Sequence, residues 1–288
     1  MEHLPHVFLH TLLDFAKLLP FLFLAYLVME LIEHRAGEKT RALIKRSGRF
    51  GPVLGGALGV LPQCGFAAAT SNLYAGGLIT RGTLIAVFLS TSDEMLPILV
   101  SSGASVGIIL KLLGLKLLTG IAVGFVVDLA ERLIRRGGRD HSGHIHEMCE
   151  DSGCGCGDHG VFRAALSHTV KIGLFILAIT LAVNIAVEFL GEDRLAAFAA
   201  SAPVAGSLIC GIVGLIPNCA GSVVLTELWL GGAIGTGAML SGLMVSSGLG
   251  LLVLFRSNKK LGDNLITLGV LYVSGVVCGT LLGMLPIF

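Results

Sequence analysis

Two short stretches of the chain set a proline, an amide and a cysteine side by side in apolar surroundings, at 61–65 (LPQCG) and 216–220 (IPNCA). A proline removes a backbone donor and disfavours helix in the preceding residue, so each stretch predicts a helix break. A thiolate at such a break is a ligand for Zn(II), Cu(I), Cd(II) or trivalent arsenic rather than for Mg(II) or Ca(II). The residues of the two predicted breaks are Pro62, Gln63 and Cys64, and Pro217, Asn218 and Cys219.

Carboxylates inside apolar runs predict a second kind of chemistry. Asp93 and Glu94 lie in the middle of the run 84–100, and Glu227 follows the second break at the position that corresponds to Asn72 after the first. A carboxylate within a membrane segment is costly and is normally retained for a function. We predict that these acids bind a cation, carry protons for antiport, or both. The alternative is an ordinary solvated position near the lipid headgroups.

The centre of the chain carries a dense set of metal-binding side chains. They are His141, His144, His146, Cys149, Cys154, Cys156 and His159. Mixed imidazole and thiol donors bind Zn(II) or similar ions once they are deprotonated. Because the cysteine spacing is not that of a zinc finger, we interpret the segment as a flexible metal sensor or delivery loop; the alternative is a merely polar linker.

The composition requires a membrane. Hydrophobic residues make up 54% of the 288 residues and charged residues 14%, with a mean hydropathy of +0.86, which one soluble core could not bury. Runs long enough to span a bilayer are 7–32, 84–100, 110–129, 162–190, 238–255 and 265–287. No basic stripe with interleaved aromatic residues indicates a nucleic-acid partner. We expect membrane lipid and the transported ion as partners, and we expect the protein to require no cofactor. The sequence leaves open whether the protein forms a homo-oligomer.

The chain contains an internal repeat. Pro62 and Pro217 are 155 residues apart (217 minus 62), and the same ungapped offset pairs Cys64 with Cys219 and many glycines. Paired motifs at a constant offset predict two copies of one unit. The expected organisation is a first membrane repeat at 1–128, a linker at 129–160 and a second membrane repeat at 161–288. Cys210 and Cys278 have no repeat partner and are expected to be buried core cysteines.

Basic residues predict the orientation. They cluster at 35–49, 132–139 and 256–260, which places these segments in the cytoplasm, whereas 191–203 carries two acids and one arginine and is expected outside. Matching loops then lie on opposite sides. The predicted fold is an all-α inverted repeat of two five-segment units, with about ten transmembrane segments. The segments around each Pro-x-Cys break are either re-entrant half-helices or short crossings. The linker is cytoplasmic and both termini lie outside an inner membrane.

Three functions fit these features. The first is a secondary exporter of a heavy-metal ion or metalloid, with Cys64 and Cys219 at its centre and acids that couple transport to protons. No phosphate-binding P-loop is present, which disfavours coupling to ATP within this chain. The second is a carrier that relays a small sulfur species such as thiosulfate through its thiols. The third is a membrane thiol oxidoreductase, which the cysteines of the reducing cytoplasmic side disfavour. The first interpretation describes a transporter and not an enzyme.

The two motif regions resemble a known family. The stretches PQCGFAAATSNLYAGGLITRGTLIAVFLSTSDEMLPIL and PNCAGSVVLTELWLGGAIGTGAMLSGLMVSSGLGLLVLFRSNK, joined by a His/Cys-rich linker, resemble the arsenic-permease-like, ten-helix heavy-metal exporters. The resemblance covers nearly the full chain. It implies a bacterial inner-membrane exporter of a heavy metal or metalloid. Family members carry the names arsenic efflux protein and manganese transporter, and arsenite would favour the two thiols, whereas manganese would favour Asp93, Glu94 and Glu227.

Overall fold

The computed structural model describes residues 50–61, 64–92, 95–134, 203–217 and 219–285, with single positions inside 12–27 and 162–181. For Cys64 and Cys219 it describes the backbone only. These parts of the chain form helices and contain no strand. The helices are α3 (Gly51–Gly59), α4 (Cys64–Ala75), α5 (Arg81–Ser90), α6 (Met95–Ser101), α7 (Val106–Ile134), α11 (Pro203–Gly214), α12 (Cys219–Leu230), α13 (Thr236–Val245), α14 (Gly250–Ser257) and α15 (Leu261–Gly283).

The helices of the second half begin at the repeat offset. Helices α4, α5, α6 and α7 start at Cys64, Arg81, Met95 and Val106, and α12, α13, α14 and α15 each start 155 residues later (219 minus 64, 261 minus 106). Even the turns match. Gly77 after α4 and Gly232 after α12 have positive φ angles of 71° and 73°, the left-handed conformation that ends a helix and that glycine adopts without strain.

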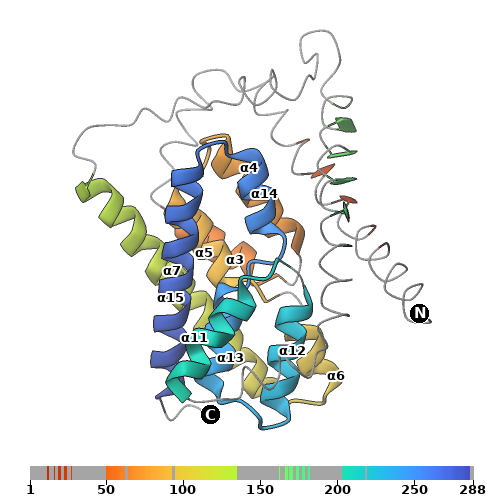
Figure 1. Cartoon of the computed structure of the whole chain (residues 1–288), viewed down its shortest axis with the longest axis vertical. Helices are drawn as coiled ribbons and strands as arrows, with labels where there is room; N and C mark the ends of the chain where they lie inside the picture. The colour runs from red at the N-terminus through yellow and green to blue at the C-terminus, as the bar shows by residue number, and fades with distance from the viewer. Residues whose placement is uncertain are drawn as a thin grey trace.

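The two halves pack in corresponding pairs. Within the first half α3 and α7 pack on α5, and within the second half α11 and α15 pack on α13. Between the halves, α4 packs with α14 and α12 packs with α6. Figure 1 shows the α4–α14 pair near one end of the molecule and the α12–α6 pair near the other. Each half therefore completes its packing with a short helix from the other half.

One end of the molecule, which we call the Arg81 end, gathers the start of α5, the finish of α7 and the start of α15. Arg81 forms ion pairs with Glu131 of α7 and with Asp263 of α15. Since α7 finishes where α15 begins, these corresponding helices point in opposite directions. The basic residues at 132 and 256–260 lie at this end as well, in agreement with the prediction that they share one side. Which side of the membrane this is stays a prediction.

Helices α3 and α4 form a hairpin whose outer ends both lie at the Arg81 end. Gly51 at the start of α3 lies directly against Thr83 of α5, and near the finish of α4 the Tyr74 hydroxyl accepts a hydrogen bond of 3.2 Å from Arg81 Nε. The inner end of α3 lies against the start of the α5–α6 break, because Ser92 Oγ donates to the Val60 carbonyl at 2.8 Å.

The apolar runs 84–100 and 238–255 lie in candidate membrane spans, but each is interrupted. Helix α5 stops at Ser90 and α6 starts at Met95, while α13 stops at Val245 and α14 starts at Gly250. Thr91 and Ser246 leave the helical conformation, with ψ angles of 130° and 105°. The polar clusters STS (90–92) and SSG (246–248) mark the two breaks. Pro97, whose ring disfavours helix four residues upstream, follows the first break, and Gly248, with a φ angle of 53°, lies in the second.

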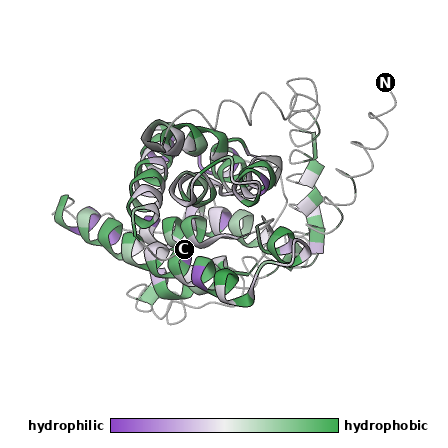
Figure 2. Cartoon of the chain, turned by 90° about the horizontal axis from the view of Figure 1, so that it is seen from below, coloured by the Kyte–Doolittle hydropathy of each residue, from purple (hydrophilic) through white to green (hydrophobic). Residues whose placement is uncertain are grey.

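The broken helices are central and the unbroken ones peripheral. Four stretches of helix in the described chain are long and apolar enough to cross a membrane, the two broken ones counted as single stretches. Three-quarters or more of each broken stretch is buried, against 22% of Val106–Ile134 and 33% of Leu261–Gly283. The outer helices carry many apolar residues (Figure 2), such as the exposed Leu118 and Val273. These faces suit contact with lipid.

Close packing of α11 on α13 depends on glycine. A Cβ on Gly214 would collide with the Gly242 carbonyl oxygen, whereas a Cβ on Gly269 of α15 meets nothing within 4 Å. We expect Gly214→Ala to lower the free energy of unfolding by about 1–3 kcal/mol, because the backbones must separate. Gly269→Ala, the matched control, should be neutral or stabilising by up to about 1 kcal/mol, since alanine favours helix. Titration with SDS in mixed micelles, followed by circular dichroism, measures both; equal effects would contradict the prediction.

Candidate functional site

A small polar cavity lies where the two broken helices meet. Its lining residues are Thr91, Ser92, Met95, Lys116, Ser222, Leu243 and Ser246. About 10 Å³ of it is open to the centre of a water molecule, which is room for about one water or one bare ion. The lining combines the C-terminal ends of α5 and α13 with the starts of α6 and α12. Irregular backbone at membrane depth is tolerated where it lines such a cavity.

Lys116 joins the two breaks. It projects from α7 and is fully buried, and its Nζ donates to the carbonyl of Thr91 and, at 3.0 Å, to the carbonyl of Leu243. These carbonyls belong to the ends of α5 and α13, where no following turn of helix supplies an N–H group. An ammonium at a helix C-terminus is also favoured by the helix dipole. The corresponding residue of α15 is the buried Leu271, so one lysine serves both halves.

The first Pro-x-Cys break lies close to the α5–α6 break. The Val60 carbonyl at the end of α3 accepts from Ser92 Oγ, which agrees with the expectation that the proline frees carbonyls near this position. Gly59 packs directly against Ser90 and the Val87 carbonyl, so α3 and α5 approach closely where both end. Two interrupted segments of the first half therefore meet at one depth.

The cysteine-bearing helix starts lie near the same region. Ser222, which lines the cavity, is in the first turn of α12, the helix that begins at Cys219. Ala67, in the first turn of α4, lies against Gly250 at the start of α14. The side chains of Cys64 and Cys219 are outside the described residues, and so are Pro62, Gln63, Asn218, Asp93 and Glu94. Pro217 is described and half-buried.

The structure places the corresponding residues Asn72 and Glu227 in different environments. Asn72 of α4 is 2% exposed, and its Oδ1 accepts a hydrogen bond of 2.6 Å from Ser257 of α14. Its Nδ2 is buried without a hydrogen-bond partner. Glu227 of α12 is exposed. The seam between α4 and α14 is further closed by Ser71, whose Oγ donates to the Gly250 carbonyl at 2.7 Å.

The linker residues His141 to His159 lie outside the described residues. Among the described residues no three His, Cys, Asp or Glu side chains gather into a metal site. Both Cys210 and Cys278 are free thiols. Cys210 is buried in the core, which confirms the prediction for it, whereas Cys278 is only partly buried and packs against the core.

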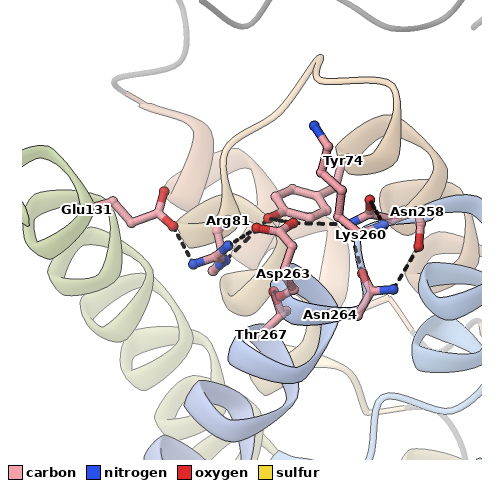
Figure 3. A network of polar contacts seen from close by, with 8 residues as sticks. All are labelled: Tyr74, Arg81, Glu131, Asn258, Lys260, Asp263, Asn264 and Thr267. Atoms are coloured by element: carbon pink, nitrogen blue, oxygen red, sulfur yellow. Dashed lines mark hydrogen bonds and ion pairs between the residues drawn. The ribbon is translucent and has the colours of Figure 1, made fainter. Parts of the chain in front are cut away.

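A charged cluster ties the halves together at the Arg81 end (Figure 3). Arg81 is 5% exposed and contacts Glu131 at 2.5 Å, Asp263 and Tyr74. The Tyr74 hydroxyl donates to Asp263 at 2.8 Å, and the Asn258 amide also donates to Asp263, at 3.0 Å. At the opposite end the corresponding pair is neutral, since Trp229 Nε1 donates to Thr236 Oγ1 at 3.0 Å.

Sequence reasoning missed Lys116 and the hydroxyls around it. A signal was present: Lys116 is a cation inside a 29-residue apolar helix, and an intramembrane charge indicates function by default. The pairing of Ser92 with Ser247 at the repeat offset was visible too. It pointed to matching polar positions without revealing that each one interrupts a helix.

Comparison with known proteins gives one match. A family model described as "Putative, 10TM heavy-metal exporter" matches residues 6–170, which is more than half of the chain. Neither the curated proteins nor the solved structures include a match. The matched range covers the first Pro-x-Cys break, α3 to α7 with Lys116, and the His/Cys-rich segment. The chain therefore belongs to the family that this model describes.

Proposed function

We propose that the protein is a secondary transporter that exports a heavy-metal ion or metalloid through the cavity between its two broken helices. The observation that carries the proposal is that four ends of interrupted helices converge on that cavity. The hydroxyl side chains of Thr91, Ser92, Ser222 and Ser246 and the buried Lys116 line it. Transporters bind substrate near the midplane with unwound backbone and half-helix ends. The family assignment gives no support to the sulfur carrier.

An inverted repeat supports alternating access in this proposal. Three observations favour an inverted repeat. Corresponding helices start 155 residues apart, α7 and α15 point in opposite directions, and each half packs a short helix, α4 or α12, against the other half. The α3–α4 hairpin, with both outer ends at the Arg81 end, favours a re-entrant arrangement for the first Pro-x-Cys segment. In this arrangement rocking of one half against the other would expose the cavity to each side in turn.

The proposed substrate ligands are of two kinds. The described lining offers hydroxyl and carbonyl oxygens, which suit Mn(II)-like ions, and the Met95 thioether. Cys64 and Cys219 would add soft thiolate donors, and Gln63 and Asn218 would add amide oxygens, from the helix starts next to the cavity. Asp93, Glu94 and Glu227 are the proposed carriers of coupling protons, and the His/Cys-rich linker is the proposed cytoplasmic metal sensor of this inner-membrane protein.

Metal content of cells tests the export proposal. We expect a metal-sensitive bacterium that produces the protein to hold several-fold less of one element among Mn, Zn, Cd, Co, Ni and As after challenge. The double variant Cys64→Ala/Cys219→Ala should raise that element again, because thiolate ligands dominate the binding of soft ions. Elemental analysis of washed cells gives the readout.

The matched control is Cys210→Ala/Cys278→Ala, which removes the same number of thiols from core positions. This variant should export like the wild-type protein at equal membrane abundance. Accumulation of an element in wild-type cells, or no change in any element, would contradict export. Equal loss in both double variants would contradict the assignment of Cys64 and Cys219.

A further inference from the structure

Lys116 contacts a helix C-terminus from each half of the molecule. A helix C-terminus carries a partial negative charge, which favours an ammonium group there. The Lys116 ammonium, with its contacts to Thr91 and Leu243, supplies one positive charge at the same point. A single side chain thus neutralises a helix end from each half of the molecule.

A transporter that moves a cation meets a difficulty on its return. With the cation bound, the carbonyls at the two helix ends have a partner; after release they would be left buried without one while the metal-free carrier, with its coupling protons on the acids, reorients. Buried polar groups and charges without partners are costly. A cation fixed to the protein removes that cost, because it can occupy the helix ends whenever the substrate is absent.

We propose that Lys116 is a tethered cation that replaces the transported metal ion at the carbonyls of Thr91 and Leu243 in the empty carrier and so permits its return. The proposal rests on the proposed function and narrows its substrate to a cation. In the loaded carrier the metal ion takes the two carbonyl oxygens and the ammonium is displaced from them. No proton has to leave Lys116 and no covalent bond changes, because two hydrogen bonds are exchanged for two metal–oxygen contacts. Lys116 is a positioning residue for the conformational cycle.

Proteoliposomes separate the return step from the rest of the cycle. Radioactive Cd(II) and Mn(II) are the probes, with arsenite measured by elemental analysis. Exchange is measured with metal on both sides, where the carrier always moves loaded. Net efflux is measured into metal-free buffer, where the carrier must return empty. The main variant is Lys116→Gln, whose amide still donates to carbonyls but carries no charge.

For Lys116→Gln we expect net efflux to fall at least about tenfold, which corresponds to 1.36 kcal/mol on the return barrier, while exchange stays within a factor of about two. Retained exchange also shows that the variant is folded. Lys116→Arg, which keeps the charge, should retain both activities. Lys111→Met alters an exposed lysine of the same helix and should change neither.

Each other outcome overturns the proposal. Undiminished net efflux in Lys116→Gln shows that the charge is not needed for return. Loss of exchange together with net efflux, in a variant whose thermal unfolding matches the wild type, assigns Lys116 to binding instead. If Lys116→Gln unfolds, Lys116→Arg decides by the same comparison: a folded Arg variant that loses net efflux contradicts a role for the charge. If the wild-type protein transports only arsenite, the substrate is not a cation and this proposal is refuted, while the export proposal stands. If the wild-type protein transports none of the probes, the proposed function itself is refuted.

Discussion

Arg81→Ala is expected to lower the free energy of unfolding by about 3 kcal/mol, because removing one partner of a buried ion pair leaves the other charges unpaired. Arg81 is nearly inaccessible and holds two carboxylates, from α7 and α15, that are themselves only 25% and 17% exposed. Without the guanidinium, Glu131 and Asp263 would face each other across a cavity. The same cluster contains Tyr74 and Asn258, so the loss spreads to both halves (Figure 3).

Two further variants sharpen this prediction. Arg81→Lys keeps the charge but not the planar fork that reaches both carboxylates, so its loss should fall between zero and that of Arg81→Ala. Lys260→Ala removes an exposed cation from the same end and should change stability by no more than about 0.5 kcal/mol. SDS titration in mixed micelles measures all three. An Arg81→Ala protein as stable as Lys260→Ala would show that the cluster does not stabilise the fold.

Asp128→Ala is the second variant for which we expect a large effect, again about 3 kcal/mol, because two charge-assisted hydrogen bonds are lost. Asp128 of α7 is 7% exposed. One of its oxygens accepts from the backbone N–H of Gly82 at 2.9 Å, and the other accepts from Thr80 Oγ1 at 2.9 Å. The carboxylate therefore caps the start of α5 and interacts favourably with its dipole.

Asp128→Asn provides the matched control. Its amide oxygen can still accept from Gly82, so the expected loss is about 1 kcal/mol, the usual net value of one hydrogen bond. Gly82 lies directly against α7, since a Cβ there would collide with the Gly124 carbonyl and with Asp128. The measurement is the same unfolding titration. Equal losses in the Asn and Ala variants would mean that the charge contributes most of the stabilisation and would contradict the hydrogen-bond account.

Much of the architecture could be predicted because it depends on local sequence and composition. Pro62 and Pro217 predict interruptions, and α4 and α12 do begin immediately after them, at Cys64 and Cys219. The 155-residue offset between paired motifs reappears as the offset between helix starts. Basic segments at 132 and 256–260 predict a common side, and the structure brings them to one end. Each of these inferences needs only local backbone chemistry or composition.

The sequence by itself determined the membrane class and the family resemblance that the family model confirms, and it predicted the duplication and the Pro-x-Cys interruptions. Tertiary structure decided the breaks at 91–94 and 246–249, the partner of Lys116 in each half, and the cluster around Arg81. The physical reason is that these features depend on groups far apart in the chain: Lys116 is 25 residues from Thr91 and 127 from Leu243. At each break the Lys116 ammonium satisfies a carbonyl at the helix end, and only the packed fold brings that ammonium to both.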